Sequence, residues 1–140
     1  MANALYDSAR ELFLEGGITW TTDTIKACLV DTSIYTVNLS SHQYLGTSGV
    51  VAAIVGGASG RSSAFASKTA TGGAADAADI TFSSISGASI EAIIIYIDSG
   101  VDNTSQLIAY IDTATGLPIT PNGGDIIVTW DNGANKIFKL

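Results

Sequence analysis

The apolar side chains near the N-terminus recur with the period of an α-helix. They fall at positions i, i+4, i+7 and i+8, so they share one face of a helix. Asn3 is suited to the N-cap of this helix, and the pair Gly16-Gly17 is typical of a helix end. The pattern therefore predicts a helix over about residues 3–15 that packs on the remaining chain, since so short a helix is marginal alone. The residues of the stripe are Leu5, Ala9, Leu12 and Phe13.

After Gly17 the apolar period changes to two, which indicates β-strands. The run Ile90 to Ile97 is almost continuously apolar and β-branched, so we expect a central strand covered on both faces. Asn132-Gly133 is a strong hairpin signal between the last two strands. A single helical turn at 41–45 and a loop over 69–78 are also expected. Further strands are predicted near 25–30, 61–68, 80–82, 107–111, 126–130 and 137–140.

These short segments, separated by Gly, Asn and Asp turns, predict the fold class. We expect a mostly β protein, an antiparallel β-sandwich or barrel of about seven to eight short strands with one N-terminal α-helix. The 140 residues are a common size for one domain, and no linker or repeat interrupts them. We therefore expect a single domain over residues 1–140.

Charge and cysteine content narrow the function classes. The net charge is −7, and the six Lys and Arg residues are scattered, so nucleic-acid binding and anionic membranes are disfavoured. Only 14% of residues are charged, below the usual ~25%, which suggests that part of the surface meets another protein. No apolar run approaches the ~20 residues that span a bilayer, and the N-terminus lacks the pattern of a signal peptide. The single cysteine, Cys28, allows no intrachain disulfide and fits a reducing compartment.

Nucleophilic catalysis would need a base beside a nucleophile. His42 is the only histidine and could in principle activate Ser41, Ser48 or Cys28, although a polar turn residue is the simpler interpretation. The glycine-rich stretch 56–60 lacks the spacing of a nucleotide loop. We therefore expect no catalytic residue and no cofactor, so the chain is predicted not to be an enzyme.

Two acidic turns offer oxygen ligands for a cation. They lie at 98–103 and 131–135, yet neither has the spacing of an EF-hand loop, and Asp and Asn are ordinary turn residues. We expect no metal site, and whether these turns bind a cation stays open.

A carbohydrate-binding module or small hydrolase is an alternative from a different class. Trp20 and Trp130 could stack on sugar rings, and Glu91 and Asp112 could supply a carboxylate pair. For both tryptophans a place in the core or at a strand edge is the simpler expectation.

The segment 50–60 is the candidate for a partner contact. It places apolar residues beside Gly-rich flanks at 46–49 and 56–60, which we interpret as hinges. A monomer could bury these side chains, but an excursion from the sheet that carried them would need a partner to cover it. The predicted contact residues are Val50, Val51, Ile54 and Val55.

Several stretches across most of the chain resemble a family of small bacteriophage proteins encoded among virion genes. Their shared motifs consist of turn and core residues, and the segment 46–60 departs from the more polar loop expected there. The stretches are ALYD (4–7), ITW (18–20), DTIK (23–26), LVD (29–31), YTVNL (35–39), HQYL (42–45), GASIEA (87–92), LIAYID (107–112) and GGDIIVTW (123–130).

This resemblance implies a structural role in the virion and no catalytic residue. The leading hypothesis is a capsid decoration, or cement, protein that binds the major capsid protein lattice from outside, in a virion assembled in the bacterial cytoplasm. A tail, neck or fibre component of the same particle is the alternative. The implied partners are the major capsid protein or other virion proteins, and a homo-oligomer is possible.

Overall fold

The computed structural model describes residues 3–140, and within them it confirms the predicted fold class. The protein is mostly β, its strands pair antiparallel, and α1 is the only helix longer than one turn in this range. The elements are β1 (Ala4–Leu5), α1 (Asp7–Glu15), β2 (Ile25–Val30), α2 (Val50–Ala53), β3 (Ala74–Ala75), β4 (Ile80–Phe82), β5 (Ala92–Ile97), β6 (Leu107–Ile111), β7 (Ile126–Val128) and β8 (Phe138–Lys139), with short 3-10 helices at Gly57–Gly60, Thr71–Gly73 and Asp102–Thr104.

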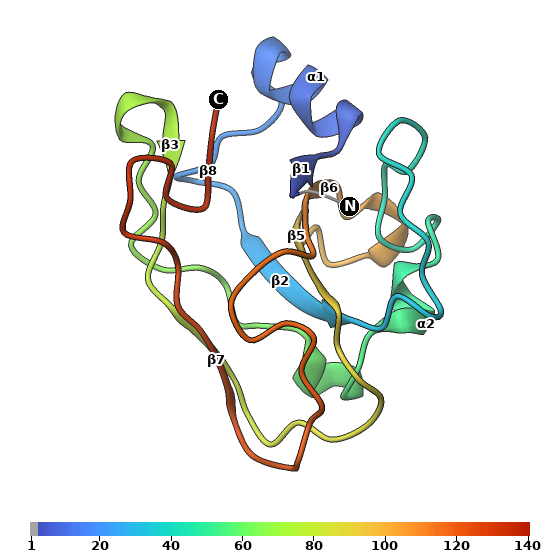
Figure 1. Cartoon of the computed structure of the whole chain (residues 1–140). Coiled ribbons are helices and arrows are strands. Elements are labelled where there is room, and N and C mark those ends of the chain that lie inside the picture. The colour runs from blue at the N-terminus through green and yellow to red at the C-terminus, as the bar shows by residue number, and fades with distance from the viewer. Residues whose placement is uncertain (1–2) are drawn as a thin grey trace.

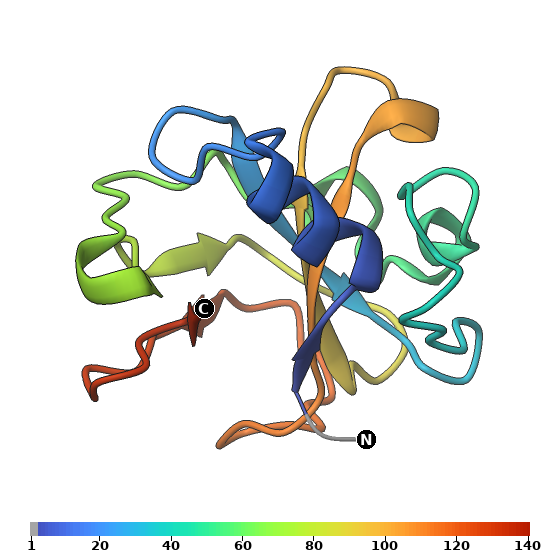
Figure 2. The ribbon, with the colours of Figure 1, turned by 90° about the horizontal axis from the view of Figure 1, so that it is seen from above.

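A four-stranded sheet in the order β1-β6-β5-β2 forms the centre of the molecule. Two smaller antiparallel pairs, β3-β8 and β4-β7, give the fold its sandwich-like form (Figure 1). α1 lies across the four-stranded sheet, and the C-terminal strand β8 lies close to β3 (Figure 2). The buried apolar side chains form one contiguous cluster that includes residues of both sets of strands.

The central strand β5 behaves as its composition predicts. It pairs with β2 on one side and β6 on the other, and all of its residues except Ile97 are buried. Because neighbouring β-branched residues point to opposite faces, Ile93 and Ile94 contribute to the core on both sides of the sheet.

Aromatic side chains connect the small strand pairs to the segment that precedes β2. The Trp20 ring meets Phe138 of β8 and Phe65 edge-on, with centroids 5.3 and 6.1 Å away. Phe65 in turn packs against Trp130, at 5.5 Å. Such contacts bury much apolar area per residue, so they stabilise short strands that would be marginal alone.

The N-terminal helix is shorter than the sequence predicts. It begins at Asp7, because residues 4–5 pair with β6 as strand β1. Asn3 does not cap the helix: its side-chain oxygen accepts the backbone N–H groups of Asp112 and Thr113. The predicted end of the helix at Gly16-Gly17 is confirmed, since Gly16 has a φ of 78° and forms the C-cap.

The predicted hairpin at Asn132-Gly133 is wrong. β7 pairs with β4, and β8 pairs with β3, so the two strands that flank this turn do not pair with each other. The predicted helical turn at 41–45 is absent, the predicted strand at 61–68 is irregular, and the predicted loop at 69–78 contains β3. In the described part of the chain, no helix has the length and apolar character needed to cross a membrane.

Candidate interaction surface

The segment predicted to contact a partner is largely integrated into the core. Val50 is fully buried and Val55 nearly so, while Ile54 is half-buried and Val51 is 39% exposed. The apolar run forms the single-turn helix α2 and then a bridge to β2, so it is not an excursion from the sheet. Of the four predicted residues, only Val51 and part of Ile54 are open to a partner, and that contact stays a prediction.

This segment covers the outer edge of the four-stranded sheet. β2 is the last strand of the sheet, so its outward N–H and C=O groups need partners. Asp31 N–H donates to the Ala53 carbonyl, and Val55 N–H donates to the Leu29 carbonyl. Farther along the same edge, the N–H groups of Ser62 and Phe65 donate to Ala27 and Ile25. Residues 53–65 therefore form an irregular cover, which we call the sealed edge.

The glycines around this segment form tight turns and close contacts, not hinges. Gly49 and Gly56 have φ of 93° and 87°, a left-handed conformation that glycine adopts without strain. Gly60 lies so close to the chain that a Cβ atom there would be 1.9 Å from the Val55 carbonyl oxygen. The interpretation of these glycines as hinges is therefore wrong.

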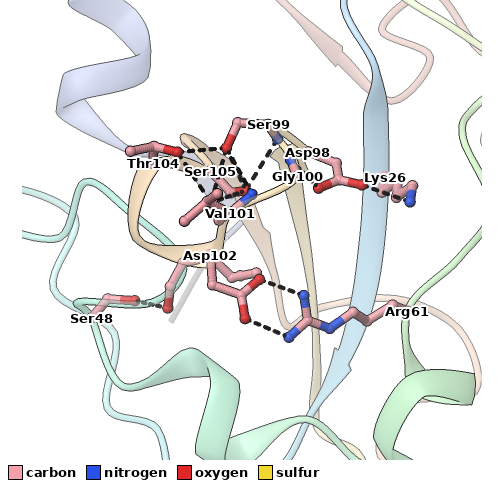
Figure 3. Close-up of polar contacts among 11 residues, drawn as sticks. Lys26, Ser48, Arg61, Asp98, Ser99, Gly100, Val101, Asp102, Thr104 and Ser105 are labelled. Atoms are coloured by element: carbon pink, nitrogen blue, oxygen red, sulfur yellow. Dashed lines mark hydrogen bonds and ion pairs between the residues drawn. The ribbon is translucent and has the colours of Figure 1, made fainter.

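A bidentate ion pair fixes the sealed edge to the loop after β5. The Arg61 guanidinium nitrogens lie 2.7 and 3.0 Å from the Asp102 carboxylate oxygens (Figure 3). The hydrogen bonds from Arg61 hold the pKa of Asp102 below its usual range. On the neighbouring strand Lys26 pairs with Asp98 at 2.7 Å. Asp98 and Asp102 belong to the acidic turn at 98–103, and each of these two carboxylates forms an ion pair with a basic side chain of the protein itself.

A groove of about 880 Å³ lies at the opposite end of the sheet. Its walls come from α1, β1, β6 and the C-terminal segment that contains β8. Leu14 is 89% exposed and Leu140 is 62% exposed, so two of the most exposed large apolar side chains of residues 3–140 lie in this one groove. The half-buried side chains that complete its apolar lining include Phe13, Ile111, Ile137 and Phe138.

The charge of the groove differs from that of the chain as a whole. Arg10 and Lys139 are exposed in its lining, and no Asp or Glu lines it within residues 3–140. The chain has a net charge of −7, so a groove lined by two cationic side chains and by no Asp or Glu side chain of residues 3–140 is a local exception. An apolar groove with a positive rim can bind apolar side chains together with a negative charge.

The only histidine takes part in a hydrogen-bonded chain with two tyrosines. His42 Nδ1 lies 2.8 Å from the Tyr35 hydroxyl, which lies 2.8 Å from the Tyr6 hydroxyl. Burial lowers the pKa of His42 and raises the pKa of Tyr35 to about 12. The His42 ring is therefore hydrogen-bonded to Tyr35, and within residues 3–140 it forms no hydrogen bond with Ser41, Ser48 or Cys28.

Cys28 is buried in β2, and burial raises the pKa of its thiol to about 12. The thiol is consequently protonated near neutral pH, which makes it a poor nucleophile. Ser48, the other distant candidate, donates its hydroxyl proton to the Leu45 carbonyl.

Two further acidic candidates, Asp131 of the second acidic turn and Glu91 of the possible carboxylate pair, have local structural partners. Asp131 accepts the Gly133 N–H in its own turn, as expected from turn chemistry, and Glu91 accepts both the N–H and the hydroxyl of Thr32. Among the described residues, no group of three or more His, Cys, Asp and Glu side chains is arranged to hold a metal ion.

The two tryptophans occupy the core, as the simpler interpretation predicts. Trp20 and Trp130 are 5% and 7% exposed. Their indole N–H groups donate to the Asp76 and Ala78 carbonyls. Neither ring presents a face for a sugar to stack on, so this support for a carbohydrate-binding module is lost.

The pattern of the sequence does not predict the groove. Its two most exposed apolar residues lie at opposite ends of the chain, and only the fold brings Leu14 and Leu140 together. Leu14 carried a weak signal, because it lies outside the apolar stripe of the helix and so faces solvent.

No protein-family model matches the chain, and no curated protein is significantly similar to it.

Proposed function

We propose that the chain is a non-enzymatic structural protein of a bacteriophage virion. It binds the major capsid protein lattice as a decoration protein, and it is incorporated when the particle assembles in the bacterial cytoplasm. The observation that carries the binding role is the apolar groove at the β1 end of the sheet, where Leu14 and Leu140 are exposed to solvent. The virion setting comes from the sequence resemblance.

Two physical features support a binding role. Exposed large apolar side chains that gather in one groove mark an interaction site more often than singly scattered ones do. The low charged fraction of 14% also suits a protein whose surface is partly covered by neighbours. The net charge of −7 suits a site on the exterior of a capsid, away from the packaged nucleic acid, because an acidic protein repels phosphates.

The test is the copy number of the chain in purified particles of the phage that encodes it. Quantitative mass spectrometry should find hundreds of copies for each particle if the chain decorates the capsid. A few dozen copies or fewer would instead place it in the tail, neck or fibre. Its absence from the particle would contradict the proposal, and a cryo-electron map of the same particles would locate the chain.

A further inference from the structure

We propose that the groove binds an extended peptide segment of its partner, with alternating apolar side chains and at least one carboxylate, which pairs with the free edge of β8. This inference rests on the proposed binding function and specifies the chemistry of what is bound. The segment lies beside β8 as an added strand, and its apolar side chains contact Leu14 and Leu140.

The backbone of β8 offers the hydrogen-bonding groups that such a strand needs. Leu140 N–H donates to the Gly73 carbonyl on β3. Because hydrogen-bonded residues alternate along an antiparallel strand, Lys139 directs its own N–H and C=O away from β3. β8 pairs with no other strand among residues 3–140, and none of the groove-lining residues comes from β3. An unpaired edge of this kind is a template for strand addition.

The side chains around this edge favour an apolar occupant. Leu14 and Leu140 are exposed, and Phe13 and Phe138, whose ring centroids are 5.9 Å apart, pack together beneath the groove. A strand added to β8 would direct every second side chain toward this surface. Alternating apolar residues would therefore be buried here, while the intervening residues stay in water.

The charges select an acidic segment over a basic one. Arg10 and Lys139 are exposed at the groove and form no ion pair within residues 3–140. With two cations and no Asp or Glu side chain in the described lining, the groove favours an acidic peptide over a basic one, although the whole chain has a net charge of −7. Charge complementarity thus distinguishes the groove from the rest of this acidic protein.

The experiment uses the full chain to select from a displayed library of random peptides of about ten residues, which covers the usual length of a strand. Selected peptides should carry alternating apolar residues and at least one Asp or Glu. Leu14→Ser and Leu140→Ser should each weaken binding of a selected peptide by about tenfold, because an apolar contact is lost. Ile127→Ser removes an apolar side chain that is 66% exposed on β7, outside the groove, and should leave binding unchanged.

A charge reversal tests the electrostatic part separately. The double variant Arg10→Glu and Lys139→Glu should reject the acidic peptides and select basic ones from the same library. All variants should keep the thermal midpoint of the parent chain, since each changed side chain is exposed. Enrichment of no common pattern, selection of basic peptides by the parent chain, or binding unaffected by Leu14→Ser would overturn the inference. A groove-dependent dimer in sedimentation would also overturn it, because a second copy would then be the occupant.

Failure of this inference can be told apart from failure of the proposed function. If the chain is present in particles and the Leu14→Ser and Leu140→Ser variants are incorporated normally, the structural role stands and the groove proposal is wrong. If the chain is absent from particles but selects acidic apolar peptides, the peptide site stands and the virion role is wrong.

Discussion

Two strand edges of the molecule differ in how they are protected: the outer edge of β2 in the four-stranded sheet, and the edge of β8 in the β3-β8 pair, which lies near the β1 end of that sheet. At the β2 end, residues 53–65 supply hydrogen bonds to the outward backbone groups, and Arg61 fixes this cover to Asp102. At the β1 end, a groove between α1 and β8 leaves apolar side chains and the edge of β8 exposed. Both regions are rich in apolar residues, so hydrophobicity alone does not identify a binding surface. The difference lies in whether the chain itself supplies the cover.

The largest effect is expected from breaking the sealed edge at Gly60. Gly60→Ala would place a Cβ atom 1.9 Å from the Val55 carbonyl oxygen and 2.9 Å from the Ile54 side chain. The backbone must shift to relieve these contacts, so we expect the free energy of unfolding to fall by about 3 kcal/mol. Gly57→Ala is the control, since a Cβ there has no neighbour within 4 Å and only its φ of 58° is unfavourable. Equal urea stabilities of the two variants would mean that the cover is not held in this conformation.

A smaller effect should separate buried from exposed positions within the same segment. Val50→Ala removes contacts from a fully buried side chain, so we expect a loss of about 2 kcal/mol. Val51→Ala, at a residue 39% exposed, should change the free energy of unfolding by less than about 0.5 kcal/mol. Urea denaturation of both variants checks the difference. Similar losses would contradict the description of α2 as a helix with one buried and one exposed side.

Only part of the fold could be predicted from the sequence. The strands at 92–97 and 107–111 were predictable, because nearly continuous β-branched or apolar runs favour buried strands whatever their partners, and the strand at 25–30 was predictable from its period of two. The turn at Asn132-Gly133 misled because turn propensity is local, whereas the pairing of β8 with β3 depends on the whole core. The apolar composition of segment 50–55 fits a contact surface and a core equally well. Whether its side chains are buried therefore depends on the fold and could not be predicted from the segment alone.

The groove could not be predicted for a related reason. It combines residues from α1 and from the C-terminal segment, and the pattern near Leu140 contains no signal that it meets the helix. The start of the helix was also misplaced, since pairing of Ala4 and Leu5 with β6 outweighed the helical period that includes Leu5. In both cases a contact between distant parts of the chain decides the structure.

The smallest expected effect is the change in the free energy of unfolding at acidic pH that comes from His42, which is hydrogen-bonded to Tyr35. Burial lowers the pKa of His42, so the folded state disfavours its protonation. The resulting stability is fully present above the unfolded pKa of about 6.5 and is lost as pH falls through the lower folded pKa. Between pH 7 and pH 5 the free energy of unfolding should therefore decrease, and His42→Gln should reduce this slope. An unchanged slope in the variant would show that His42 does not titrate in this way.

The most direct test of the account is hydrogen–deuterium exchange of the chain, free and bound to purified capsids. Segment 53–65 should already be protected in the free chain, and its protection should change little on binding. Protection should instead increase at the C-terminal segment 137–140 and at α1, where the partner strand covers the groove. New protection at 50–55 with no change at 137–140 would contradict it, because the contact surface would then be the segment that the structure shows packed against the chain's own sheet.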